Sequence, residues 1–277
     1  MSIFELIDAG DARGTRDLLA ADPGLASARA EQGVTALMRA SYRGGPVFAA
    51  VQDAEPELDP WDRILVGESD GLPAPDAWSP DGFTPLHIAA FAKNAAAAQT
   101  LVDAGADVNA FATASFARVT PLGTCAFVGA TEVGRILLRA GANPTLTEVE
   151  GGSPLDAAMH NGYRDLVALC FVLVAHGYVD AVRGGLQHDP TLANATVDWG
   201  GGDWESALGA ASHVGNREIA ELLLEHGARL DVFAAAMLEM VGVVSAALEA
   251  RPELRDATGP HGIPLRAHAK GAVQELF

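Results

Sequence analysis

Hydrophobic and polar residues alternate along this chain with the period of short helices. In one segment, Ile219, Leu222 and Leu223 fall on a single helical face. Gly227 follows that segment, and a glycine there can adopt the left-handed conformation that ends a helix. Shorter, alanine-rich segments precede such helices, and several begin with Thr-Pro or Ser-Pro, which suits a helix cap and a first turn. The pattern predicts pairs of short antiparallel helices.

These helix pairs repeat along the chain. Thr84, Thr120 and Ser153 open matching segments at intervals of roughly 33–36 residues. A second type of segment alternates with the first. Its copies share an aligned Phe and an aligned Pro, at Phe4, Phe171, Phe233, Pro23, Pro190 and Pro252. Because a single pair cannot bury its apolar face alone, we expect an all-α solenoid of roughly eight to ten helix-turn-helix units.

Four short motifs carry a resemblance to a known family. They are TPLHIAA (84–90), AGADVNA (104–110), TPLGTCA (120–126) and AGANP (140–144), and they resemble the ankyrin repeat. The alternating Phe…Asp-Pro…Leu segments look like those of stand-alone bacterial ankyrin-repeat proteins. The resemblance implies a concave binding face, made from the turn tips and the exposed positions of the first helix of each pair.

We expect a single ankyrin-repeat domain over residues 1–277. It divides into N-terminal units (1–58), a degenerate unit or loop (59–81), three TPLH-type units (82–170) and C-terminal units (171–277). Residues 44–80 are acidic and proline-rich, and we expect an irregular loop there. The segment 163–177 has no helix breaker, so it must supply the second helix of one unit and the first helix of the next.

Charge and composition narrow the classes of partner. The net charge of −18 repels nucleic acid and anionic membranes and attracts a protein partner, including one with a basic surface. The excess of acid could instead serve solubility alone. The longest apolar run, Leu166–Ala175, is too short to span a membrane, and the acidic N-terminus does not look like a secretory signal. With two cysteines, Cys125 and Cys170, at positions that align with core residues, we expect buried thiols and a cytoplasmic location.

Apart from Trp78, in the acidic segment 44–80, the candidate binding residues come from two sources. One column of first-helix positions is aromatic in the first half of the chain and carries histidines in the second. The other source is the stretch DWGGGDWESALGAASH (198–213), whose glycines 200–202 we expect in a turn. The candidates are Tyr42, Trp78, Phe91, Phe127, His160, Trp199, Asp203, Trp204, Glu205 and His213. The leading hypothesis is a non-enzymatic scaffold that binds a protein partner through its concave face, without a cofactor.

Two alternatives stay open at this point. The aromatic rings could instead pack beneath neighbouring turns. The second half could also hold a pocket for a small-molecule ligand or for catalysis, formed by His160, His176, His213, Asp203 and Glu205. Stacked helices lie about 8–10 Å apart, so His160 and His213, two units apart, cannot share an ion. Only neighbours, His160 with His176 or His176 with His213, could cooperate, and we expect no metal site.

Overall fold

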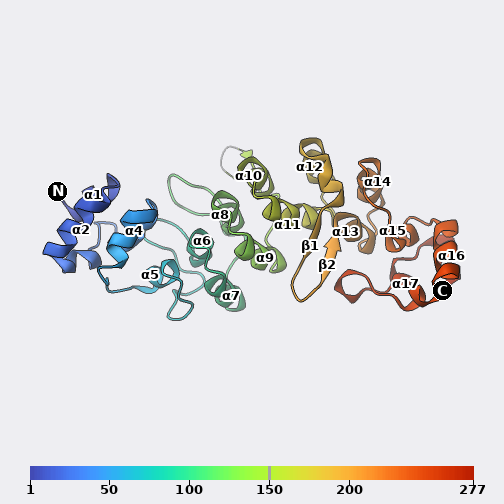
Figure 1. Cartoon of the computed structure of the whole chain (residues 1–277), viewed down its shortest axis with the longest axis horizontal. Coiled ribbons are helices and arrows are strands. Elements are labelled where there is room, and N and C mark those ends of the chain that lie inside the picture. Colours follow the sequence, from blue (N-terminus) through green and yellow to red (C-terminus); the bar gives the residue numbers. More distant parts are fainter. Residues whose placement is uncertain (149–150) are drawn as a thin grey trace. The chain divides into compact units, whose positions relative to one another are not determined.

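The computed structural model describes residues 1–148 and 151–277, and helices dominate this part of the chain (Figure 1). The α-helices are α1 (Ile3–Asp8), α2 (Ala12–Ala21), α3 (Ala36–Ser41), α4 (Gly45–Gln52), α5 (Pro60–Leu65), α6 (Pro85–Phe91), α7 (Ala95–Asp103), α8 (Pro121–Val128), α9 (Thr131–Arg139), α10 (Pro154–Asn161), α11 (Arg164–Val174), α12 (Val179–His188), α13 (Ala207–His213), α14 (Arg217–Glu225), α15 (Val232–Met237), α16 (Val241–Ala250) and α17 (Leu265–His268). The 3₁₀ helices are η1 (Pro23–Ser27), η3 (Pro190–Asn194), η4 (Pro252–Asp256), η5 (Pro260–Gly262) and η6 (Gly271–Leu276). Two short antiparallel strands, β1 (Thr196–Asp198) and β2 (Trp204–Ser206), form a hairpin.

The chain forms two compact bodies. The N-terminal body contains Met1–Asn143 and Thr147–Gly152, and the C-terminal body contains Pro144–Leu146 and Ser153–Phe277. In the N-terminal body the first helices of successive pairs pack on one another (α1 on α3, α6 on α8), and so do second helices (α2 on α4, α7 on α9). In the C-terminal body α13, α15 and α17 pack in the same order. Each body is therefore a stack of helix pairs, which confirms the all-α fold.

The residues expected to cap the first helices do so. Thr84, Thr120 and Ser206 are the N-caps of α6, α8 and α13, and the side chain of Ser206 accepts a hydrogen bond from the backbone N–H of Gly209. A proline follows the cap in α6 and α8, where its missing N–H leaves no helical hydrogen bond unmade. Asn216 caps α14 in the same way as a Ser or Thr would. Local sequence thus marks the start of these four helices.

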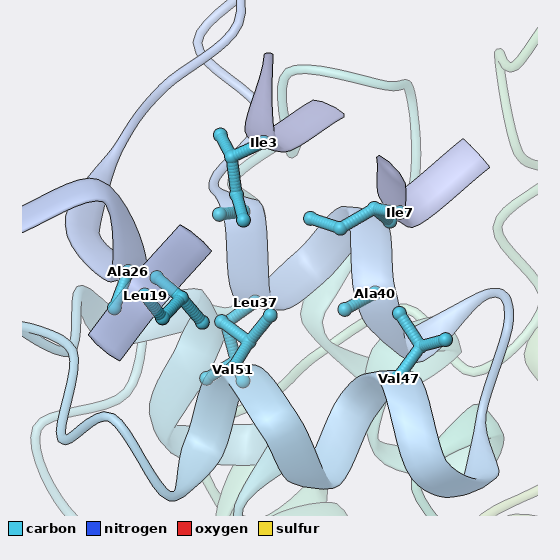
Figure 2. Close-up of a cluster of buried hydrophobic side chains, with 9 residues drawn as sticks. Ile3, Ile7, Leu19, Ala26, Leu37, Ala40, Val47 and Val51 are labelled. Atoms are coloured by element: carbon cyan, nitrogen blue, oxygen red, sulfur yellow. The ribbon is translucent and has the colours of Figure 1, made fainter. Parts of the chain in front are cut away.

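Small and medium-sized apolar side chains fill the space between the helices of each pair. In the N-terminal body, Ile3 and Ile7 of α1 converge with Leu37 of α3 and Val51 of α4 (Figure 2). Burial of one such Leu or Ile side chain contributes roughly 1.5–3 kcal/mol to folding. Alanines such as Ala40 separate these larger side chains, which lets the helices approach closely.

The loop expected near residues 44–80 is shorter than the sequence indicated. Helix α4 begins within it because Pro46 lies in the first turn, where it is tolerated, and Val47 and Val51 bury one face of the helix. Helix α5 also lies in this range, capped by Asp59, but no second helix follows it before Thr84. Pro46 and Asp59 therefore lie at the starts of α4 and α5, and this range does not form one continuous irregular segment.

Two other expectations about connections are confirmed. Helix α11 is continuous and packs against both α10 and α12, so one helix serves two successive pairs, as the lack of a breaker in 163–177 requires. Glycines 200–202 link β1 to β2 with φ values of +114°, +70° and +86°, a left-handed region that other residues rarely adopt. The described residues include no helix that is both long and apolar enough to cross a membrane.

Candidate functional site

One candidate site is a groove on the N-terminal body, here called the aromatic groove. It has a volume of about 550 Å³. Its lining consists of Asp8, Arg39, Tyr42, Arg43, Phe83, Phe91, Phe116, Ala117, Val119, Gly123, Thr124 and Phe127. Five of these twelve residues are aromatic, and charged side chains of both signs lie beside them.

The repeat places three of these rings in a column. Tyr42 follows α3, Phe91 ends α6 and Phe127 lies in the last turn of α8, so equivalent positions of three first helices contribute one ring each. The rings of Tyr42 and Phe91 are in edge contact at 5.6 Å between centroids. Phe116, from the connection between α7 and α8, contacts Phe83 at 5.8 Å. Phe127 and Phe116 remain 71% and 69% exposed.

Polar contacts hold the edge of the aromatic groove in place. The phenol of Tyr42 donates a hydrogen bond to Asp81, and burial together with this bond raises the pKa of Tyr42 above its ordinary range. The phenol therefore stays protonated as a donor. Arg39 forms two hydrogen bonds with Asp8, at 2.7 and 3.0 Å. The ring of Tyr42 is consequently fixed, whereas Phe127 protrudes into solvent.

Trp78 lies outside the aromatic groove. Together with Phe116 it lines a neighbouring, more polar groove of about 540 Å³ beside the turn tips of the N-terminal body. Its side chain is exposed. Trp78 is thus accessible, as a binding candidate must be, but it belongs to a different hollow from Tyr42, Phe91 and Phe127.

A second candidate site is a cluster of four side chains in the C-terminal body, here called the histidine cluster. It consists of His176, Glu205, His213 and His261. His176 follows α11, Glu205 lies in β2, His213 ends α13 and His261 lies in η5. One nitrogen of each imidazole and one carboxylate oxygen all lie within 4.8 Å of one another. These four could hold a metal ion.

Glu205 is the centre of the histidine cluster. Its Oε1 lies 3.5 Å from Nε2 of His176, 3.2 Å from Nδ1 of His213 and 3.4 Å from Nε2 of His261. Its other oxygen, Oε2, accepts a 2.6 Å hydrogen bond from the indole N–H of Trp199. Burial alone would raise the pKa of Glu205, but the interactions with His176 and His213 outweigh it and lower the pKa to about 2. The carboxylate is therefore ionised in the interior of the protein.

Two of the imidazoles are oriented by further partners. Nδ1 of His176 lies 3.1 and 3.0 Å from the carbonyl oxygens of Val172 and Leu173. Nδ1 of His261 lies 2.7 Å from Oδ2 of Asp203, whose Oδ1 also accepts the backbone N–H of His261. Since carbonyl and carboxylate oxygens only accept, each Nδ1 carries a proton, and Nε2 is the nitrogen that faces Glu205.

The structure separates the other sequence-predicted residues of this region. His160 is exposed on α10 and is not a member of the histidine cluster. Trp199 is buried against Glu205, whereas Trp204 is 61% exposed. His261 was not among the candidates from the sequence. It lies three residues before the cap of α17, as Asp203 does before the cap of α13, and this shared position is the signal that could have paired them.

Comparisons with known proteins agree with the fold. The family model described as "Ankyrin repeat" matches residues 81–112, which include α6 and α7. The chain is also 32% identical over 204 residues to Neurogenic locus notch homolog protein 2 of Homo sapiens and of Mus musculus, and equally to Neurogenic locus notch homolog protein 1 of Rattus norvegicus. Each match covers 74% of this chain, and the chain spans 7% of the length of these relatives.

Three observations lead to the same family: the stacked helix pairs, the Thr and Ser caps of several first helices, and the matched segment 81–112. Ankyrin repeats serve in general as scaffolds for protein–protein interaction, through the extended surfaces that stacked repeats create. This chain is an ankyrin-repeat protein.

Proposed function

We propose that this protein is a non-enzymatic scaffold that binds a protein partner through the concave face of its repeats, with the aromatic groove as the main contact. The observation that carries the proposal is the set of rings around that groove, two of which, Phe116 and Phe127, are mostly exposed. Aromatic residues and arginines are enriched where proteins meet. Arg39 and Arg43 lie beside the rings here.

Energetics support a partner at this groove. An exposed Phe side chain gains roughly 1.5–3 kcal/mol when it is fully buried, and a partner could bury both Phe116 and Phe127. The ring of Tyr42 is already held by Asp81, so binding would not have to immobilise that side chain. A preformed groove with protruding rings is thus suited to a partner that offers an apolar segment.

The net charge of the chain indicates which charge the partner should carry. With a net charge of −18, the surface outside the groove favours a partner with a basic surface, through faster and salt-sensitive association. The cytoplasmic location and the single domain over residues 1–277 stay predictions.

One observation favours a second candidate function, a site for a small-molecule ligand or for catalysis in the C-terminal body. His176, Glu205 and His213 were expected to contribute to such a pocket, and they lie together with Asp203 beside them. An acid–base pair could be built from such residues. Under this alternative, a ligand would change the fluorescence of Trp199 or Trp204, and His213→Ala would abolish the change.

Comparative capture tests the leading proposal. Wild type, Phe91→Ala, Phe127→Ala and Tyr178→Ala are immobilised in equal amounts, and proteins captured from the native cells are quantified. Tyr178 is an exposed aromatic residue in the C-terminal body and serves as the matched control. We expect a partner that wild type and Tyr178→Ala retain equally and that the two Phe variants lose by tenfold or more. Equal capture by all four proteins would exclude the aromatic groove as the contact.

A further inference from the structure

The histidine cluster contains buried polar atoms that the described residues do not satisfy. The carboxylate of Glu205 is 0% exposed, and the imidazole of His213 is 9% exposed. Neither Oε1 of Glu205 nor Nδ1 of His213 has a hydrogen-bond partner of acceptable geometry within the described part of the chain. An unsatisfied buried polar group costs about 1–3 kcal/mol, and more when it is charged. Two such atoms, 3.2 Å apart, point to something that both could bind.

The distances fit a tetrahedrally coordinated metal ion. Zinc binds nitrogen and carboxylate oxygen at about 2.0–2.2 Å, so neighbouring ligand atoms of a tetrahedral site are about 3.3–3.5 Å apart. Oε1 of Glu205 lies 3.2, 3.4 and 3.5 Å from the three imidazole nitrogens. The largest separation among the four ligand atoms is 4.8 Å, so the rings must turn towards the ion as it binds.

Hydrogen bonds to neighbouring groups orient the imidazoles of the cluster, as they do in known metal sites. Imidazoles that bind a metal typically donate their other N–H to a backbone carbonyl or a carboxylate, which fixes the tautomer. His176 meets this condition through Val172 and Leu173, and His261 meets it through Asp203. Trp199 donates to Oε2 of Glu205 and leaves Oε1 for the ion. The arrangement therefore directs two Nε2 atoms and one carboxylate oxygen to the same point.

We infer that His176, Glu205, His213 and His261 bind one divalent transition-metal ion of the zinc class. Nε2 of His176, Oε1 of Glu205, Nδ1 of His213 and Nε2 of His261 are the ligand atoms. Imidazole and carboxylate ligands suit zinc, whereas magnesium and calcium prefer sites built from oxygen. Four protein ligands fill a tetrahedral shell, which is typical of a structural rather than a catalytic ion.

The ion would clamp separate elements of the C-terminal body. Its ligands come from the end of α11, from β2, from the end of α13 and from η5, so four separate elements of the C-terminal body are joined at one point. This inference departs from the expectation of no metal site. The distance argument behind that expectation compared helices two units apart, whereas Glu205 and His261 lie on connections that reach across the helix ends. The inference does not depend on binding at the aromatic groove.

Titration of the metal-stripped full-length protein with Zn²⁺ tests the site. Wild type is expected to bind one equivalent by calorimetry, with a rise in melting temperature and a change in tryptophan fluorescence, because Trp199 contacts Glu205. Glu205→Gln and His261→Ala are expected to lose this saturable binding. His261 lies in an exposed turn, so His261→Ala should fold even if a substitution at buried Glu205 does not. His160→Ala, an exposed histidine outside the cluster, is the matched control and should bind as wild type does.

Asp203 is not a proposed metal ligand, so a substitution there tests whether the orientation of the His261 imidazole matters for metal binding. Asp203→Asn keeps an acceptor for the backbone N–H of His261 but weakens the hold on its imidazole. Loss of such an outer partner lowers metal affinity about 10–100-fold, and we expect a drop in that range. Mg²⁺ should produce no saturable effect on wild type. Weak binding of several zinc ions that is equal in wild type, His261→Ala and His160→Ala would overturn the inference, and so would no binding at all.

Discussion

The carboxylate of Glu148 occupies the space that a side chain at Gly123 would fill. A Cβ atom built on Gly123 would lie 2.2 Å from both oxygens of Glu148. Oε1 of Glu148 instead accepts hydrogen bonds from the backbone N–H and the hydroxyl of Thr120, at 2.7 and 2.6 Å. In the preceding repeat, His87 holds the cap Thr84 from within its own helix. Glu148 thus takes over, from a later segment of the chain, the role that a histidine plays in the TPLH motif.

Because Glu148 fills the space beside Gly123, we expect strong energetic coupling between positions 123 and 148. Gly123→His should destabilise the protein by about 2 kcal/mol or more, because the new side chain and Glu148 compete for one space. The double variant Gly123→His with Glu148→Ala should recover part of that loss, since the imidazole can then hold Thr120. Urea unfolding of the four proteins measures the coupling free energy, for which we expect about 1–3 kcal/mol. Strictly additive effects would show that the two residues do not share a site.

Two adjacent glycines in α12 provide a matched packing test. A Cβ on Gly185 would lie 2.6 Å from the ring of Phe171, whereas nothing lies within 4 Å of a Cβ on Gly184. Gly185→Ala should therefore cost about 1–3 kcal/mol of unfolding free energy. Gly184→Ala should be neutral or stabilising by about 0.5–1 kcal/mol, because alanine favours a helix. Similar unfolding midpoints for both variants would contradict the packing of α12 on Phe171.

The buried imidazole of His87 should make the stability of the protein depend on pH. Burial lowers its pKa to about 4 in the folded protein, against an ordinary 6.5 in the unfolded chain. Between these values the unfolded state binds more protons, so stability is complete above about pH 6.5 and falls as the pH drops towards 4. The loss attributable to His87 is of order 3 kcal/mol at the lower limit.

The variant His87→Gln isolates this contribution. Asp62, whose pKa burial raises to about 6, acts in the opposite direction, because its folded form gains protons over the same range. Both proteins share the contribution of Asp62. It therefore cancels when the free energy of unfolding of His87→Gln is subtracted from that of wild type. That difference should decrease from about pH 7 to pH 5, and a constant difference would mean that His87 is not buried as a neutral imidazole.

The two cysteines should be inert towards thiol reagents in the native protein. Cys125 and Cys170 are buried, and burial raises the pKa of Cys170 to about 12, so its reactive thiolate is scarce. We expect no modification over minutes in native buffer and two modified thiols per chain in urea. Rapid reaction of a thiol without denaturant would contradict the burial of that residue.

Sequence periodicity predicted the fold well because each repeat carries its own local signals. Thr84, Thr120, Ser153 and Ser206 cap helices as expected, since a cap depends on residues only a few positions away. The extent of the loop near 44–80 was harder to predict. Proline marks a helix start as well as an irregular segment, and burial of Val47 and Val51 decides between the two.

Only some residues of the candidate sites could be predicted from the local sequence pattern. The column of Tyr42, Phe91 and Phe127 follows from repeat register alone, and the structure brings all three to one groove. Phe116 and His261 lie on connections between helices, where repeat length varies and register is lost. Their places depend on which connections of successive repeats lie side by side. That information is absent from helical periodicity.

The most direct test of the proposed scaffold is the affinity of a captured partner for the aromatic groove. Titration calorimetry of the purified partner against wild type, Phe127→Ala and the control Tyr178→Ala gives the three dissociation constants. If Phe127 anchors the interface, its removal costs about 2 kcal/mol or more, and the dissociation constant rises about 30-fold while Tyr178→Ala leaves it unchanged. A dissociation constant within about twofold of wild type for Phe127→Ala would contradict binding through the aromatic groove.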